Sequence, residues 1–152
     1  MAKYFAFEFP GTGVLARARL LEKEAPQTCR LLWERLPYEG TCGHAMLSGT
    51  ICALYIDPKI VIPTENATGN VQENDLMFTH YDADTRHGFP EPLSEIYWAY
   101  DRYVTPTSPG MMAPVYPNVF GEILPGADAF YDLCRRIRRE GIRPIRVTGV
   151  SD

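Results

Sequence analysis

The chain has 152 residues, of which 45% are hydrophobic and 22% charged, and its formal net charge is −4. This composition is typical of a globular protein, and we expect residues 1–152 to form a single domain. The mild negative charge gives no electrostatic reason to expect nucleic acid or an anionic membrane as a partner. No apolar run approaches the roughly 20 residues of a membrane helix. Near the N-terminus, Glu8 interrupts the apolar run that a signal peptide would need. We therefore expect a cytoplasmic protein.

The four cysteines lie inside predicted elements rather than in loops at the spacings of a disulfide framework. We expect Cys29, Cys42, Cys52 and Cys134 to be free, buried thiols. Cys42 and His44 share one face of a predicted strand, as two metal ligands could, but further ligands at metal-site spacing are missing. The sequence therefore predicts no bound metal and no cofactor.

The first predicted elements are a hairpin and a helix. Residues 5–9 alternate aromatic with small or polar side chains, and a Pro-Gly turn leads into a second alternating strand at 14–21. Pro26 opens the helix, where its missing N–H costs nothing, and apolar residues at 29, 32, 33 and 36 form one stripe. Pro37 and Gly40 end it.

Strands dominate the middle of the chain. Alternation over 42–48 predicts a strand, residues 51–56 predict a second strand that is buried on both faces, and 59–63 is strand or extended chain. The segment 64–74 is polar and reads as loop, and 75–78 predicts a short strand.

The second half holds the most polar loop and the clearest strand. Residues 79–90 contain two histidines, two aspartates, an arginine and a tyrosine, and such groups often bind ligands from loops on a rigid scaffold. A solvated loop is the alternative, and a calcium loop is disfavoured because its closing glutamate is missing. Residues 95–101 alternate large apolar groups, with Ile96, Trp98 and Tyr100 on one face and Tyr97 on the other.

A loop containing four prolines, 105–117, precedes the last elements. Its exposed methionines and stiff backbone predict a subunit contact or a pocket lid, and we expect a homo-oligomer formed through it. After it come a strand at 118–124, a helix from Asp128 to Gly141, and a final strand at 142–150. The arginines near the C-terminus of that helix interact favourably with the helix dipole. We therefore expect a solvated basic face rather than a nucleic-acid patch.

Two separated motifs resemble the cyclophilins, the barrel-shaped peptidyl-prolyl isomerases. The first is Glu-Ala-Pro-Gln-Thr at 24–28, followed by an apolar helix and a Gly-x-x-x-His strand at 40–44. The second is Val-Phe-Gly-Glu-Ile at 119–123 with Gly126, a helix and a strand. The chain resembles most the small bacterial cyclophilin-like barrels of unassigned function. The resemblance implies a mainly β fold with two helices, namely a closed antiparallel barrel capped by a helix at each end.

The resemblance also implies a test of isomerase chemistry. In cyclophilins an arginine follows the histidine of the Gly-x-x-x-His strand and helps to uncouple the prolyl amide, but here Ala45 follows His44. A methyl group supplies no such donors, so prolyl isomerase activity is disfavoured and remains an alternative as a degenerate site. A hydrolase is also disfavoured, because His44 and Ser48 are roughly 13 Å apart at the rise of a strand.

The leading hypothesis is therefore a barrel that binds a small molecule without isomerase activity. An arginine with tyrosine and histidine neighbours suits an anionic group, because the guanidinium grips two oxygens. For His44, the alternative is a core histidine hydrogen-bonded to a backbone carbonyl. For the whole chain, the alternative is a structural oligomerising module. The candidate ligand-binding residues are His44, Ser48, His80, Tyr81, Arg86, Tyr97 and Tyr100.

Overall fold

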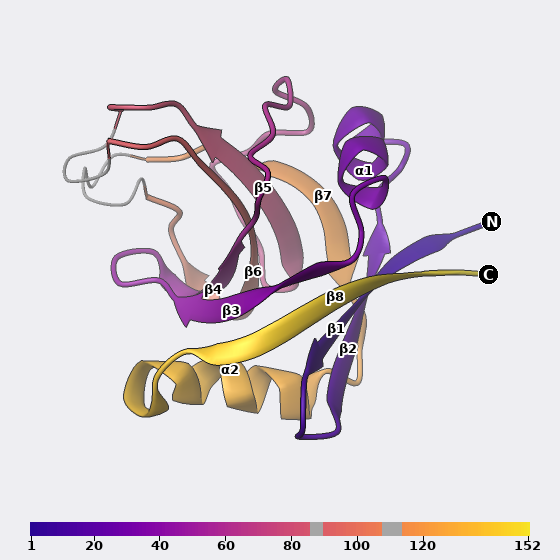
Figure 1. Cartoon of the computed structure of the whole chain (residues 1–152), viewed down its shortest axis with the longest axis vertical. Coiled ribbons are helices and arrows are strands. Elements are labelled where there is room, and N and C mark those ends of the chain that lie inside the picture. Colours follow the sequence, from indigo (N-terminus) through magenta and orange to yellow (C-terminus); the bar gives the residue numbers. More distant parts are fainter. Residues whose placement is uncertain (86–89, 108–113) are drawn as a thin grey trace.

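The fold is a closed antiparallel barrel packed by two helices (Figure 1). The computed structural model describes residues 1–85, 90–107 and 114–152. In these residues the strands are β1 (Lys3–Phe9), β2 (Val14–Leu20), β3 (Tyr38–His44), β4 (Gly49–Tyr55), β5 (Asp75–Tyr81), β6 (Leu93–Val104), β7 (Asn118–Ile123) and β8 (Arg143–Ser151), and the helices are α1 (Pro26–Trp33) and α2 (Asp128–Glu140). The strand order is β1-β2-β7-β5-β6-β4-β3-β8, and β8 pairs with β1 to close the barrel. The predicted fold class is confirmed.

Alternation along the strands fills the barrel with aromatic rings. On β1, Phe5, Phe7 and Phe9 are fully buried, while Ala6 and Glu8 between them face outward. Because successive side chains of a strand point to opposite faces, this is the outcome that the period of two predicts. Figure 1 shows the chain ends side by side, where the backbone N–H of Asp152 donates to the carbonyl of Ala2.

The helices lie toward opposite ends of β1. Trp33 at the end of α1 stacks on Phe5, with ring centroids 6.5 Å apart. Phe130 of α2 stacks on Phe9, four residues further along the strand, with centroids 5.0 Å apart. The two apolar stripes read from the sequence therefore face the two ends of one barrel core.

A glutamate from a distant loop caps helix α1. Ala25 at the N-terminus of the helix has no side-chain cap of its own. The Glu65 carboxylate instead accepts hydrogen bonds from the backbone N–H of Gln27 at 3.1 Å and of Thr28 at 2.8 Å, and from the Thr28 hydroxyl at 2.7 Å. Burial acts to raise the pKa of Glu65, but these hydrogen bonds outweigh it and the pKa is lowered.

Replacing Glu65 with alanine should destabilise the protein by about 1–2 kcal/mol at neutral pH, because the first amides of α1 lose their cap. The folded-state pKa is lowered, so this stability is present above the ordinary glutamate pKa and is lost as the pH falls through the folded value. Urea unfolding from pH 7 to pH 3 measures it. Glu24→Gln, a change at an exposed neighbour, is the control. Equal pH profiles for wild type and Glu65→Ala would contradict the assignment.

Several predicted boundaries are wrong. Strand β3 begins at Tyr38, because it pairs with β8 from there, and it ends at His44 rather than at residue 48. Gly49 adopts φ +84°, and a Cβ there would lie 1.9 Å from the carbonyl oxygen of Tyr103, so the chain turns at a position that only glycine fits. Strand β5 continues past residue 78 to Tyr81 by pairing with β6. The segment 59–63, predicted as strand or extended chain, forms no strand.

Candidate functional site

The candidate site is a pocket of about 560 Å³ on the outer face of the barrel. It is lined by side chains from the segments 41–48, 51–55, 95–97 and 106–107, together with Tyr81 and Ile142. We call it the outer-face pocket. Strands β3, β4, β6 and β5 present to it the residues that alternate with those of the barrel core. On β6, for example, Tyr97 faces the pocket while Trp98 is buried in the core.

Two small residues in neighbouring strands hollow the floor of this pocket. Gly43 of β3 is the cross-strand partner of Ala53 of β4, and Ala53 is in turn the partner of Tyr97 of β6. A Cβ built on Gly43 would meet only one side-chain atom, Ile142 Cγ2, at 4.0 Å. Because Gly43 has no side chain and Ala53 has only a methyl group, this cross-strand row leaves a depression beside the larger Tyr97.

Hydrogen bonds fix one wall of the pocket to its rim. The backbone N–H of Thr107 donates to the Ser48 hydroxyl oxygen at 3.0 Å, and the two hydroxyls of these residues are 3.1 Å apart. The backbone N–H of Thr105 donates to the Ser48 carbonyl at 3.0 Å. Ser48, which is buried, thus joins the turn between β3 and β4 to the segment after β6. Its position indicates a structural contribution to the pocket.

Polar groups gather at the β5 side of the pocket. Glu95 is only 7% exposed, and the Tyr81 hydroxyl donates to its Oε1 at 3.3 Å. The Tyr97 hydroxyl lies 2.6 Å from the Thr79 hydroxyl. Burial, followed by the charge of Glu95, raises the pKa of Tyr97 well above its ordinary value, so this phenol is neutral. An apolar floor beside a carboxylate and hydroxyls is the usual composition of a small-molecule site.

His44 lies between the pocket and the barrel interior. Its Nδ1 is 2.7 Å from the Ala45 carbonyl, so Nδ1 carries the proton, and Nε2 accepts a hydrogen bond from the Tyr100 hydroxyl at 2.6 Å. Burial lowers the pKa of His44, the Ala45 hydrogen bond opposes this, and the charge of Arg138 lowers it further. The geometry of His44 thus matches the alternative of a histidine hydrogen-bonded to a backbone carbonyl. A neutral ring with both nitrogens hydrogen-bonded is a poor base.

The titration of His44 should appear in the pH dependence of stability. Its folded pKa lies below the ordinary value of about 6.5, so its contribution is complete above that pH and is lost as the pH falls through the folded value. We expect a change of about 1 kcal/mol or less, because the ring is half-buried and water screens it. Urea unfolding between pH 7.5 and 5 should show a shallower slope of stability against pH for His44→Gln than for the wild type. Equal slopes for wild type and His44→Gln would refute this.

The structure brings four of the seven candidate residues to the pocket, namely His44, Ser48, Tyr81 and Tyr97. Tyr100 lies behind them on the inner face of β6 and reaches the site only through His44. The other two are considered next.

His80 and Arg86 do not join the group that the structure describes. His80 belongs to the strand β5 rather than to a loop, and it alternates with Tyr81, so it points away from the outer-face pocket. Its Nδ1 lies 2.7 Å from the Ser94 hydroxyl, and its Nε2 lies 3.3 Å from Asp82. Arg86 lies outside the described residues.

The sequence analysis missed the carboxylate and the small residues of the site. Glu95 is two residues before Tyr97, so the same alternation places both on one face of β6. Gly43 and Ala53 carry little signal in a single sequence, because small residues in a strand indicate weak packing as readily as a cavity. Ile142 and Thr107 come from segments that only the fold brings near.

No group of three or more His, Cys, Asp or Glu side chains is placed to hold a metal ion within the part of the chain that the structure describes. Cys29, Cys42, Cys52 and Cys134 are free and buried, as predicted. Burial raises the pKa of Cys29 to about 12, with Glu22 adding to the effect, so this thiol stays protonated.

Two of the four arginines in the last turns of α2, Arg135 and Arg136, form ion pairs. Arg136 bonds Glu140 at 2.9 Å, Arg143 bonds the second oxygen of the same carboxylate at 2.9 Å, and Arg135 lies 3.7 Å from Asp101. This arrangement is typical of a solvated helix surface. Across the described residues, no helix is long and apolar enough to span a membrane.

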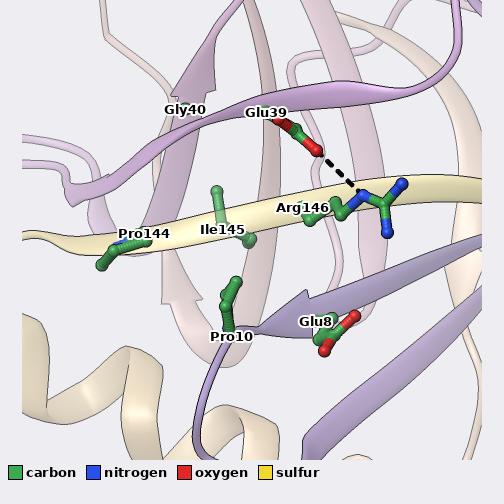
Figure 2. Close-up of a pocket in the computed structure, with 7 residues that line it drawn as sticks. All are labelled: Glu8, Pro10, Glu39, Gly40, Pro144, Ile145 and Arg146. Carbon is green, nitrogen blue, oxygen red and sulfur yellow. Dashed lines mark ion pairs between the residues drawn. The ribbon is translucent and has the colours of Figure 1, made fainter.

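A second hollow of about 390 Å³ lies over β1, β3 and β8 (Figure 2). Figure 2 shows Glu39 pointing toward Arg146, and the two form an ion pair at 3.0 Å. Glu8 is the cross-strand partner of the same arginine. Because its charges face one another over an apolar floor of Pro10 and Ile145, we regard the outer-face pocket as the better candidate.

Comparison with known proteins assigns the family. Residues 8–149 match a family model described as "Protein of unknown function (DUF3830)". The chain belongs to the DUF3830 family. No curated protein matches this DUF3830 chain significantly.

Solved structures confirm the cyclophilin-like fold of this DUF3830 protein. A structure of McbB in complex with tryptophan is similar with a TM-score of 0.68 at 19% identity, over 97% of this chain and 46% of that chain. The DUF3830 chain thus spans about half the length of the McbB chain. The crystal structure of the Mimivirus cyclophilin is similar with a TM-score of 0.57 at 11% identity, over 99% of this chain and 90% of that chain. At these identities the likeness shows the fold alone.

Proposed function

We propose that this DUF3830 protein binds a small, mostly apolar molecule in the outer-face pocket. The observation that carries the proposal is the pocket itself, about 560 Å³ in volume, with an apolar floor and a buried carboxylate. That volume lies within the range of about 300–1,000 Å³ typical of ligand sites. McbB holds tryptophan in its solved structure, so tryptophan is a reasonable test compound here, although the likeness carries only the fold.

Prolyl isomerisation is not part of this proposal. Ala45 follows His44, and its methyl side chain donates no hydrogen bond, while its carbonyl is occupied by the His44 ring. An anionic ligand was expected from Arg86, which lies outside the described residues. Of the described lining residues, only Glu95 carries a formal charge at neutral pH, and it is negative. An anionic ligand is therefore kept as an alternative outcome of the binding tests.

Self-association is the second candidate, in line with the oligomer expected from the 105–117 loop. It is favoured by four exposed apolar side chains around the mouth of the pocket, Met46, Leu47, Tyr55 and Ile142. Within the loop, Pro106, Val115 and Pro117 are buried against the protein itself, and residues 108–113 lie outside the described part. Exposed apolar groups clustered at one place often mark an interaction site.

Native mass spectrometry on gently purified protein tests both candidates. Excess mass on the folded species that disappears on denaturation is the expected result and would give the mass of a retained ligand. A ligand-free oligomer would instead favour the structural module. A cytoplasmic location belongs to the same proposal, because the four free, buried cysteines suit a reducing compartment.

A further inference from the structure

Two hydroxyl groups face each other on one wall of the outer-face pocket. Ser48 and Thr107 both line this pocket, and their hydroxyl oxygens are 3.1 Å apart. The Ser48 oxygen also accepts a hydrogen bond from the backbone N–H of Thr107 at 3.0 Å, and Ser48 is only 8% exposed. We call these two groups the hydroxyl pair. The similar pair of Tyr97 and Thr79 differs, because only Tyr97 lines the pocket.

The hydroxyl pair has one proton more than it uses. Each hydroxyl supplies one proton, and each oxygen has two acceptor positions. One proton, from either residue, lies between the two oxygens, and the Thr107 amide fills another acceptor position on Ser48. The second hydroxyl proton has no acceptor among the residues that the structure describes. A ligand that displaces water from this wall therefore loses affinity unless it accepts the hydrogen bond.

The charges around the pocket favour a neutral acceptor. None of the described lining residues is an arginine or a lysine. His44 is neutral, since its Nδ1 donates to the Ala45 carbonyl and its Nε2 accepts from Tyr100. A carboxylate entering the pocket would leave water without a cation to pair with, which is unfavourable. A carbonyl oxygen accepts the same hydrogen bond without carrying a charge.

We infer that the outer-face pocket recognises a neutral molecule that carries a carbonyl-type acceptor on an apolar body, and that the hydroxyl pair donates to this acceptor. The apolar body lies over the floor formed by Gly43 and Ala53. This inference rests on the proposed function and names its ligand class.

Three compounds of one shape test the inference on the full chain, namely acetophenone, α-methylstyrene and benzoate. α-Methylstyrene has a methylene group in place of the carbonyl oxygen, and benzoate has a carboxylate oxygen in place of the methyl group. Binding is followed by chemical-shift changes in protein NMR spectra at constant ionic strength. We expect benzoate to bind at least about tenfold more weakly than acetophenone, because its charge finds no cation. Equal or tighter binding of benzoate would overturn the inference and leave the proposed function standing. No binding by any of the three would overturn both.

A double variant separates the hydrogen bond from the shape of the wall. Ser48→Ala combined with Thr107→Val removes both hydroxyls and keeps nearly the same side-chain volume. We expect this variant to bind acetophenone about three- to tenfold more weakly than the wild type, as the loss of one hydrogen bond predicts. It should bind α-methylstyrene as the wild type does, which also shows that it is folded.

The control is Thr12→Ala, which removes a hydroxyl that bonds the backbone of the β1–β2 turn outside the pocket. It should bind both compounds as the wild type does. An unchanged affinity of the double variant for acetophenone would overturn the inference. An equal loss of affinity for acetophenone and α-methylstyrene would also overturn it, because the hydroxyl pair would then only shape the wall.

Discussion

Replacing Ala53 with phenylalanine is expected to remove ligand binding from the outer-face pocket while the barrel stays folded. Ala53 lies at the centre of the floor between Gly43 and Tyr97, and its side chain points out of the barrel. A phenyl ring there occupies the depression that the small residues leave. If the ring denies a ligand about 100 Å² of apolar contact, the loss is about 2.5 kcal/mol, or roughly 70-fold in affinity. Native mass spectrometry and NMR titration with tryptophan measure it.

The matched control is the same substitution elsewhere on the outer surface. Ala6 also faces outward in the middle of a strand, between Arg17 of β2 and Thr148 of β8, and it does not line the pocket. Ala6→Phe should bind ligand as the wild type does, and both variants should unfold at similar urea concentrations. Equal binding of a ligand by wild type and Ala53→Phe would show that the ligand binds outside the outer-face pocket. That result would contradict the proposed function.

The fold was accessible from the sequence because each element repeats a simple period. The three phenylalanines of β1 alternate with outward residues, and the apolar stripe of α2 recurs at the spacing of a helix turn, so both buried faces could be named. The two cyclophilin-like motifs then gave the order in which the elements close. Boundaries failed where the backbone departs from the period. Strand β3 already ends at His44, and β4 begins at Gly49, where a positive φ and the nearby Tyr103 carbonyl exclude a side chain.

The site was less accessible, since alternation separates two faces of a strand without saying which face is covered. His80 and Tyr100 have the right side chains for binding, but their register places them on the inner face. Tyr97 and Glu95 lie on the outer face, where the segment 105–107 and the turn before β4 build walls around them. Those walls depend on Ser48 bonding a segment 59 residues away, a contact that no local pattern contains.

The largest effect on stability is expected from Phe130→Ala. Phe130 is fully buried where α2 meets the barrel, with its ring centroid 5.0 Å from Phe9, 5.9 Å from Phe7 and 5.8 Å from Trp98. Truncating a buried phenylalanine costs about 3–5 kcal/mol, from lost apolar contact and the cavity left behind. Alanine's better helix propensity returns only about half a kcal/mol. Because small domains have about 5–15 kcal/mol of stability, we expect a large fall in the urea midpoint.

Urea unfolding measured by circular dichroism separates this effect from a general sensitivity to mutation. Leu15→Ala removes a similar amount of apolar side chain from an exposed position on β2 and should change stability by about 0.5 kcal/mol or less. A loss below about 1 kcal/mol for Phe130→Ala would mean that the barrel core is closed without α2. A loss in the expected range would show that the rings of β1 and β6 depend on this helix. The barrel that carries the outer-face pocket would then depend on a contact made entirely in its core.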